Sequence, residues 1–598
     1  MSTWRGTLRK KWAAAGILLV LAVLVGGAGA RADGPTTLYP SANERLGVGV
    51  VGDIRNYDLS PLHAGWYVNW GTSANLINPE GMDFAQIIRV GASIQPSLAQ
   101  IREIAAHNPG SLWLVGNEPD CIWQDNVWPE TYAEQYHDIY YALKEADPTC
   151  QVAIGGVVQA TPLRLQWLDR VWNWYQARYG ETMPVDVWNV HNFILQERKG
   201  SWGCEIPPGI NATAGMLYGI DDHDNMTYFR QQIEAFRRWM AEKGQQNKPL
   251  IVSEYGILFH EGLGYDYERV RRFMLATFDY FLNATDPEIG YPADGYRLVQ
   301  RWAWYSLDDP SFEQDKYTTW SALYDPFPPY AIRPLGVEFG RYAGALVVPY
   351  VDLVPARFQL DQPAALVYGE PASFTAHITV QNRGNTASAG PITLQMRQED
   401  ASGGSAMVAA GAVPALPRRY AGDAATTLTW QSVITQPLQF IVQVNPEGAV
   451  PEWNLSNNAL AYPLDVWADL ALERVGAVSS GVPFVPGERI PVQWKALVRN
   501  AGRLDIRDVE VCFWVQPPGE NEAPAGCVTL PYLAAGQSAV AQLEGTVDRP
   551  GLHQLRAVVD PNAAVSERSE SNNQALGSVL AAPHRVFWPV LRKGASAP

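Results

Sequence analysis

The chain has 598 residues, more than a single hydrophobic core serves, and we expect two to four domains. Its hydrophobic content of 47% is enough for several packed cores. The formal net charge is −16, and the Lys and Arg residues are scattered rather than clustered. Because such a chain repels phosphate backbones, we predict no nucleic-acid partner.

The N-terminus has the pattern of a secretory signal peptide, which we place at residues 1–32. Four basic residues precede an apolar run over 13–25, and the candidate cleavage sites that follow are Ala28-Gly29-Ala30 and Ala30-Arg31-Ala32. An uncleaved membrane anchor is the alternative, but the run is shorter than the ~20 residues that a span needs. Cleavage before Arg31 removes the four basic residues and gives a net charge of −16 − 4 = −20. We therefore expect a secreted protein, free or held at the cell surface, with no membrane contact after cleavage.

Short apolar segments alternate with amphipathic ones between residues 45 and 350. Helical spacing of apolar residues occurs at 96–107, 129–146 and 226–244, and a closing helix is expected at 336–348. Eight strands with helices between them predict a (β/α)8 TIM barrel as the first domain. The predicted strands are 46–51, 65–70, 84–90, 111–116, 151–157, 185–191, 249–255 and 298–306.

Beyond residue 352, strands alternate with turns rich in Gly, Pro, Asn and Ser, which predicts all-β immunoglobulin-like sandwiches. An internal repeat supports two copies, because residues 444–460 match residues 558–576. We place the sandwiches at 353–467 and 468–582, followed by a tail at 583–598. At an offset of 115, Asn445, Glu452 and Asn457 align with Asp560, Glu567 and Asn572.

These repeats resemble the CARDB family of bacterial adhesion-related, immunoglobulin-like domains. The resemblance rests on an N-x-G turn in each copy and on a hairpin of the form D-P-x-x-x-V-x-E-x-x-E-x-N-N. The second copy keeps Glu570 in this hairpin, whereas the first has Leu455. The resemblance implies an exported prokaryotic protein in which these domains have an accessory role, such as contact with cell wall or glycan. Their Asn, Asp and Glu side chains suit either calcium binding or turn formation.

Five cysteines leave at least one thiol unpaired within the chain. Cys512 and Cys527 flank a turn-rich segment and could bridge neighbouring strands. Cys121 and Cys204 each follow a predicted barrel strand, so a disulfide between two rim loops and a pair of free thiols are both open. Cys150 would then be a buried odd thiol. None of the cysteines has the C-x-x-C spacing of a zinc site, and we predict no metal site.

Two glutamates stand where apolar segments end, Glu118 in SLWLVGNEPD and Glu254 in PLIVSEYG. Cleaving the acetal between two sugars needs one carboxyl group to protonate the leaving oxygen and another to attack the anomeric carbon or activate water. In a parallel barrel the C-terminal strand ends converge, so the two glutamates can face each other across a sugar. The pair predicts glycoside hydrolysis without a cofactor.

This arrangement resembles the clan A glycoside hydrolases, which have an Asn-Glu-Pro motif after the fourth strand and a glutamate ending the seventh. The resemblance implies that Glu118 is the acid/base, that Glu254 is the nucleophile and that the reaction retains configuration. It further implies that Asn117 hydrogen-bonds the sugar 2-hydroxyl.

Further substrate-binding candidates lie at the ends of other strands. His191 ends the sixth strand, where we expect a hydrogen bond that orients Glu254, or else a rim histidine without a catalytic role. Trp302 and Trp304 share one face of the eighth strand, and Trp304 is the expected platform for a pyranose ring. The weaker candidates are Trp70, Asn69 and Tyr255.

The segments GWYVNWG, LVGNEPD and HNF resemble Asl-type β-1,3-glucanase cores, which implies a β-1,3-glucan substrate. The third strand departs from that pattern, so mannan, xylan and β-galactan stay open. A non-catalytic carbohydrate-binding or adhesion protein is the alternative function. An exported protease is a second alternative, but neither an HExxH nor a GxSxG motif supports it.

Overall fold

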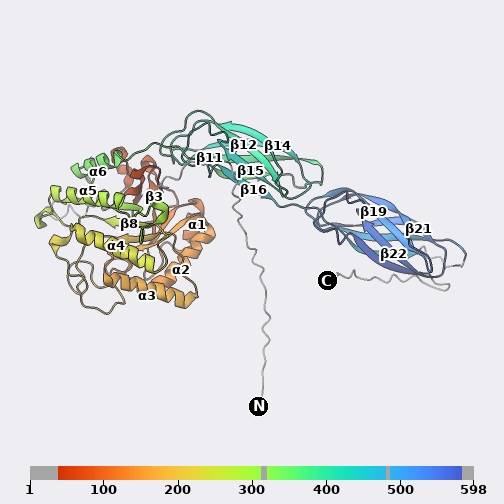
Figure 1. The fold of residues 1–598 in the computed structure, drawn as a ribbon, viewed down its shortest axis with the longest axis horizontal. Coiled ribbons are helices and arrows are strands. Elements are labelled where there is room, and N and C mark those ends of the chain that lie inside the picture. Colours follow the sequence, from red (N-terminus) through yellow and green to blue (C-terminus); the bar gives the residue numbers. More distant parts are fainter. Residues whose placement is uncertain (1–37, 311–318, 480–484, 486, 582–598) are drawn as a thin grey trace, which may run out of the picture.

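The computed structural model describes residues 38–310, 319–479, 485 and 487–581. Figure 1 shows a rounded unit of helices and strands followed by two elongated β units. The predicted signal peptide and the tail lie outside the described residues. No helix in the described part of the chain is long and apolar enough to cross a membrane.

All paired strands of the N-terminal unit are parallel. One sheet has the order β3-β2-β1-β9-β8-β7 and a second has the order β4-β5-β6. The bridges Ala153–Val187 and Val157–Val190 connect β6 with β7. The strands are β1 (Leu46–Gly49), β2 (Trp66–Val68), β3 (Asp83–Phe84), β4 (Gln86–Ile88), β5 (Leu112–Asn117), β6 (Gln151–Gly156), β7 (Trp188–His191), β8 (Leu250–Tyr255) and β9 (Arg301–Trp304). Each predicted range overlaps one of them, although 111–116 ends one residue before β5 does and 84–90 overlaps both β3 and β4.

Six α-helices are described between and after these strands: α1 (Leu98–His107), α2 (Pro129–Ala146), α3 (Pro162–Tyr179), α4 (Met226–Glu242), α5 (Tyr267–Asn283) and α6 (Pro334–Gly344). Their starts follow local chemistry. Ser97 forms a capping box with Gln100, and the side chain of Asp266 accepts from the backbone N–H of Arg269. The predicted helix at 129–146 has the bounds of α2, which begins with a proline at its first position.

Alternate residues of several strands belong to two different cores. The larger core fills the space between strands and helices. A smaller core contains inward residues from several strands, among them Ile87, Leu114, Ile251 and Ala303. This alternation decides which side chains at the strand ends face the candidate site.

Two β units follow, and they have the same topology. The first pairs β10-β11-β14 in one sheet and β13-β12-β15-β16 in another, and the second pairs β17-β18-β21 and β20-β19-β22-β23. All pairs are antiparallel, and each unit has one hydrophobic core. The identical strand order is the structural counterpart of the internal repeat.

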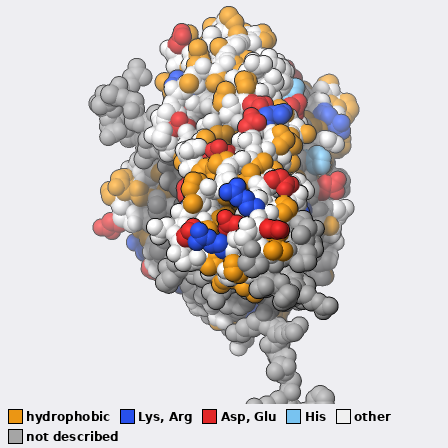
Figure 2. All heavy atoms as spheres, turned by 90° about the vertical axis from the view of Figure 1, so that its right-hand side faces the viewer, with side chains coloured by type: hydrophobic (Ala, Val, Ile, Leu, Met, Phe, Trp, Pro, Cys, Tyr) orange, Lys and Arg blue, Asp and Glu red, His pale blue; other side chains and the backbone are white. Residues whose placement is uncertain are grey.

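The strands of the first β unit are β10 (Leu353–Asp361), β11 (Pro371–Asn382), β12 (Ile392–Asp400), β13 (Ser405–Val413), β14 (Ala424–Val433), β15 (Leu438–Val444) and β16 (Ala459–Leu464). Those of the second are β17 (Leu470–Ser479), β18 (Ile490–Asn500), β19 (Ile506–Gln516), β20 (Ala523–Leu533), β21 (Ser538–Val547), β22 (Gly551–Val559) and β23 (Gln574–Ala581). Viewed from the right-hand side of Figure 1, acidic, basic and apolar side chains are interspersed (Figure 2). Ion pairs such as Arg556 with Glu522 at 2.7 Å belong to the second unit.

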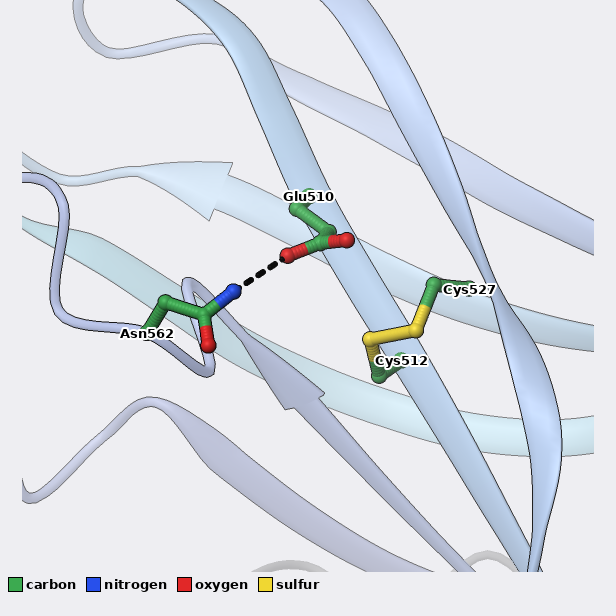
Figure 3. Close-up of a disulfide and its surroundings, with 4 residues drawn as sticks. All are labelled: Glu510, Cys512, Cys527 and Asn562. Carbon is green, nitrogen blue, oxygen red and sulfur yellow. Dashed lines mark hydrogen bonds between the residues drawn. A yellow bond between two sulfur atoms is a disulfide. The ribbon is translucent and has the colours of Figure 1, made fainter.

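The disulfide predicted between Cys512 and Cys527 is confirmed (Figure 3). The two residues are direct partners on β19 and β20, and their Cα atoms are 4.0 Å apart. Cys121, Cys150 and Cys204 are buried free thiols. The alternative disulfide between Cys121 and Cys204 is therefore not formed, and the Cys121 thiol instead lies 3.9 Å from the carbonyl oxygen of Cys204.

The loop between β13 and β14 contacts the N-terminal unit. Arg418 pairs with Glu80 at 2.8 Å, Arg419 donates to the carbonyl of Gly81 at 2.7 Å, and the Tyr420 hydroxyl donates to Asp83 at 2.9 Å. Asp83 begins β3, so this contact lies at the N-terminal ends of the parallel strands. The C-terminal ends, which carry Glu118 and Glu254, are at the opposite edge.

Candidate active site

Glu118 directly follows β5 in a tight turn. Its φ of 43° is left-handed, a conformation that costs a non-glycine residue energy. The Glu118 N–H donates to the carbonyl of Gly156 at 3.1 Å, and the Glu118 carbonyl accepts from the N–H of Cys121 at 2.9 Å. The residue is 7% exposed. The turn thus places a nearly buried carboxyl group at the C-terminal edge of the sheet.

Glu254 lies near the end of β8, and its side chain is 13% exposed. The indole Nε1 of Trp70, which follows β2, donates to Glu254 Oε2 at 2.9 Å. A Cβ at Gly49 would lie 3.0 Å from the Trp70 ring, so glycine leaves the room that the ring occupies. Trp70 therefore holds the Glu254 carboxylate through a hydrogen bond.

His191 ends β7 and lies between the two glutamates. Its Nδ1 is 2.9 Å from Glu118 Oε1 and 3.9 Å from Glu254 Oε2. The three groups each offer one atom, and these atoms all lie within 4.8 Å of one another. A Cβ at Gly156 would come within 2.2 Å of the His191 ring, so glycine at the end of β6 makes room for the imidazole.

The prediction that His191 forms a hydrogen bond with Glu254 is wrong, because the distances show that its hydrogen-bond partner is Glu118. His191 ends β7 and Glu118 follows β5, the two strands that flank β6, and the Glu118 backbone N–H is bonded to the carbonyl of Gly156 in β6. Glu254 has Trp70 as its closer partner.

Burial dominates the electrostatics of the site. It raises the pKa of Glu118 to about 7, and the nearby Arg164 guanidinium opposes this rise. Burial likewise raises the pKa of Glu254 to about 7, opposed by His191 and by the hydrogen bond from Trp70. Burial lowers the pKa of His191 and so favours its neutral imidazole, while the negative charge of Glu254 opposes this shift. The Trp70 hydrogen bond favours the ionised form of Glu254, and Arg164 favours that of Glu118.

Asn117 and Asn69, both predicted to bind sugar, differ in their surroundings. The Asn117 side chain is buried, and its amide nitrogen donates to Gln124 at 3.3 Å. Its Oδ1 is buried and has no hydrogen-bond partner among the described residues. Asn69 is exposed, and its Oδ1 accepts from the N–H of Gly71 in its own loop at 3.3 Å.

The structure corrects the placement of Trp302, Trp304 and Tyr255, which are fully buried in the core between strands and helices. Trp304 Nε1 donates to the carbonyl of Ser321 at 2.8 Å, and the Tyr255 hydroxyl lies 3.2 Å from Thr277 Oγ1. The expected alternation exists, but Ala303 occupies the inward position of β9. The even-numbered residues of β9 therefore face the helices and offer no surface to a sugar.

The aromatic residue that sequence reasoning missed is Tyr305, which follows β9. Its ring contacts that of Trp70 edge-on at 5.6 Å, and its hydroxyl donates to Asp309. The alternation along this strand could have identified Tyr305, because residues 303 and 305 share the face opposite to that of Trp302 and Trp304. Three tryptophans in loops of this unit, Trp123, Trp128 and Trp202, are exposed by 65%, 60% and 37%.

Two groups of His, Cys and acidic residues among the described residues are close enough to share a metal ion. One is Glu118, His191 and Glu254, and the other is Glu510 with Cys512 and Cys527. The second group cannot supply thiolates, because its cysteines form the disulfide. In the first group, the hydrogen bond between His191 and Glu118 uses the atoms that would bind the ion.

Comparisons with known proteins give a family for one part of the chain. The sequence model of the CARDB family matches residues 478–576, which lie in the second repeat. A CARDB domain from Pyrococcus furiosus, solved in complex with di-metal ions, is 17% identical and covers 19% of this chain and 87% of its own, with a TM-score of 0.15. A search of curated proteins found no match.

The N-terminal half is similar to two solved endo-β-1,3-glucanases of glycoside hydrolase family 128, subgroup II. The protein from Sorangium cellulosum is 15% identical and covers 50% of this chain and 97% of its own, with a TM-score of 0.33. That from Pseudomonas viridiflava is 16% identical and covers 50% and 96%, with a TM-score of 0.34. The family match confirms the predicted CARDB sequence in the second repeat.

Proposed function

We propose that the protein is a retaining glycoside hydrolase in which Glu118 is the general acid/base and Glu254 the nucleophile. One observation carries this proposal: carboxylate oxygens of Glu118 and Glu254 lie within 4.8 Å of each other at the C-terminal ends of parallel strands. Retaining enzymes hold their carboxyl groups about 5–5.5 Å apart, whereas inverting enzymes leave roughly 6.5–9.5 Å for a water molecule. The spacing favours direct attack by Glu254.

In the first step, Glu254 forms a bond to the anomeric carbon while the bond from that carbon to the leaving oxygen breaks and Glu118 protonates this oxygen. The negative charge of Glu254 is consumed, so the pKa of Glu118 falls and its carboxylate becomes a competent base. In the second step, Glu118 takes a proton from water, the resulting hydroxyl attacks the anomeric carbon, and Glu254 leaves as a carboxylate.

We propose that the two parallel sheets together form a (β/α)8 barrel and that both β units are immunoglobulin-like CARDB domains. The β6–β7 bridges and the short separation of β3 from β4 support the barrel. The identical strand orders of the β units support the second point. The domain limits 45–350, 353–467 and 468–582 belong to this proposal.

The proposed substrate is a polysaccharide, and β-1,3-glucan is placed first on the motifs GWYVNWG, LVGNEPD and HNF. Trp70 and His191, from two of these motifs, contact the catalytic glutamates. Mannan, xylan and β-galactan are alternatives. The proposed role of the CARDB domains is contact with glycan or cell wall.

We also propose that the protein is exported. The N-terminal charge pattern and apolar run support a signal peptide. The Cys512–Cys527 disulfide supports an oxidising compartment, because disulfides are rare in reducing cytosol.

The test is release of reducing ends from β-glucans, mannan, xylan and galactan by the mature protein, by Glu118→Gln and by Glu254→Gln. We expect activity on one polymer that both substitutions abolish, with the folded state verified by thermal unfolding. If all three proteins are inert but bind one of these glycans, the protein is a non-catalytic carbohydrate-binding or adhesion protein, and the hydrolase proposal fails.

A further inference from the structure

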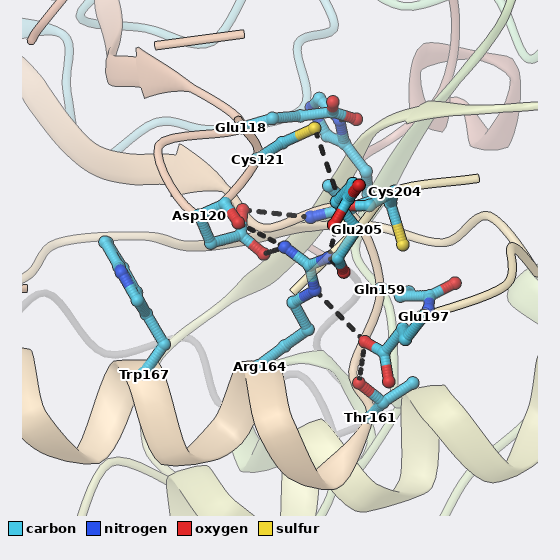
Figure 4. Close-up of polar contacts among 12 residues, drawn as sticks. Glu118, Asp120, Cys121, Gln159, Thr161, Arg164, Trp167, Glu197, Cys204 and Glu205 are labelled. Atoms are coloured by element: carbon cyan, nitrogen blue, oxygen red, sulfur yellow. Dashed lines mark hydrogen bonds and ion pairs between the residues drawn. The ribbon is translucent and has the colours of Figure 1, made fainter. Parts of the chain in front are cut away.

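Arg164 lies on the first turn of α3 and is fully buried, so water does not hydrate its charge. Its guanidinium pairs with two carboxylates that are equally buried (Figure 4). The Nη1–Asp120 Oδ2 distance is 2.9 Å and the Nε–Glu197 Oε1 distance is 3.1 Å. Burying three charges costs free energy that a hydrophobic cluster of the same size would not.

The guanidinium also binds three backbone carbonyl oxygens from two separate loops. Nη1 donates to Asp120 O, and Nη2 donates at 2.7 Å to both Cys204 O and Glu205 O. One loop follows Glu118, and the other is the long segment between β7 and α4. Arg164 therefore ties the loop that carries the proposed acid/base to a second loop on the same rim.

The turn at Glu118 needs such support. Its left-handed backbone conformation persists only where the surroundings hold it. Asp120 lies two residues further on, and its Oδ1 accepts from the N–H of Val158 at 3.3 Å, next to β6. The Arg164–Asp120 pair thus fixes the far end of a turn whose near end is the Glu118–Gly156 hydrogen bond.

We propose that Arg164 is a positioning residue for the proposed general acid, which it holds in place through Asp120 and the Cys204–Glu205 backbone. The proposal rests on the function proposed above. The charge of Arg164 lowers the pKa of Glu118 and so opposes the effect of burial; the positioning role rests on the hydrogen bonds alone. No contact between Arg164 and the sugar is required.

The first test separates acid catalysis from general stability by means of the leaving group. When a polysaccharide is cleaved, the departing sugar chain is a poor leaving group unless its glycosidic oxygen is protonated. In a 2,4-dinitrophenyl glycoside, the departing 2,4-dinitrophenolate needs no proton. In Arg164→Lys, which keeps the charge but loses the forked geometry, we expect kcat/KM for the polysaccharide to fall by roughly 10²-fold. The value for a 2,4-dinitrophenyl glycoside of the same sugar should be nearly unchanged. Equal losses on both substrates would overturn the proposal.

Arg237 offers a matched control for this substitution. It is a fully buried arginine on α4 that donates to Lys248 O at 3.0 Å and Gln300 Oε1 at 2.6 Å, at the opposite ends of the strands. Arg237→Lys should lower thermal stability without distinguishing the two substrates. Should Arg164→Lys fail to fold, Asp120→Asn removes the carboxylate that links Arg164 to the turn while keeping the side-chain shape, and the same selective loss is expected.

A second readout needs no hydrolysis and separates this proposal from the proposed function. The ¹⁵N chemical shift of His191 Nδ1 reports its hydrogen bond to Glu118. The Glu118→Ala variant provides the reference shift for a His191 that lacks this bond. We expect the signal of Arg164→Lys or Asp120→Asn to move toward the Glu118→Ala position, and that of Arg237→Lys to stay at the wild-type position. A wild-type signal in both Arg164→Lys and Asp120→Asn would overturn the positioning role, whether or not the protein cleaves any glycan.

Discussion

The indole of Trp70 should set the ionisation of the nucleophile. Trp70→Phe keeps an aromatic ring against Tyr305 but removes the N–H that donates to Glu254 Oε2 at 2.9 Å. A hydrogen bond to a charged group contributes about 1.5–3 kcal/mol. At 1.36 kcal/mol per unit, the pKa of Glu254 should rise by roughly 1–2 units above its value of about 7.

The assay is kcat/KM as a function of pH, whose acidic limb follows the ionisation of the nucleophile in the free enzyme. We expect this limb to move by roughly 1–2 units toward alkaline pH in Trp70→Phe. Trp304→Phe is the control, because it removes the N–H bond to Ser321 O from a fully buried ring elsewhere in the same unit. An acidic limb that stays in place in Trp70→Phe while the protein remains folded would refute the reasoning.

Three further predictions concern stability and cofactors. Burial raises the folded-state pKa of Glu254 from 4.5 to about 7, so its favourable contribution is complete below pH ~4.5 and is lost as the pH rises through 7. The glutamine of Glu254→Gln does not titrate. Thermal unfolding should therefore show that the stability of this variant relative to wild type is greater at pH 8 than at pH 5, by up to about 3 kcal/mol. An equal stability difference at both pH values would contradict the raised pKa of Glu254. Replacing Cys512 and Cys527 by serine opens a disulfide that spans 15 residues, and should lower the free energy of unfolding by about 3 kcal/mol in denaturant titrations without loss of hydrolysis. EDTA should leave hydrolysis unchanged, whereas a loss restored by a divalent cation would assign Glu118, His191 and Glu254 to a metal.

The sequence was sufficient for the strands and for the pairing of Glu118 with Glu254, because both depend on local patterns. The apolar segment at 111–116 leads into Glu118, the segment at 249–255 contains Glu254 near its end, and parallel strands bring these ends to one edge whatever their separation along the chain. The same logic located the Cys512–Cys527 disulfide, since a turn between two strands places its flanking residues opposite each other.

The sequence was not sufficient where a choice between two faces decided the outcome. Alternation shows that Trp302 and Trp304 share a face, but not which face is inward, and the small Ala303 occupies the inward position. The partner of His191 depends on the left-handed turn at Glu118, which no periodicity encodes. Arg164 is one of several arginines on helices, and only the fold shows that its carboxylate partners come from distant loops.

The stereochemistry of the first product tests the central claim most directly. Hydrolysis of the polymer identified in the substrate panel can be followed by ¹H NMR of the anomeric protons before mutarotation equilibrates them. For a β-linked polymer the account predicts that the β-anomer appears first, because two displacements at the anomeric carbon restore its configuration. Initial release of the α-anomer would show a single displacement by water and would contradict the assignment of Glu254 as the nucleophile.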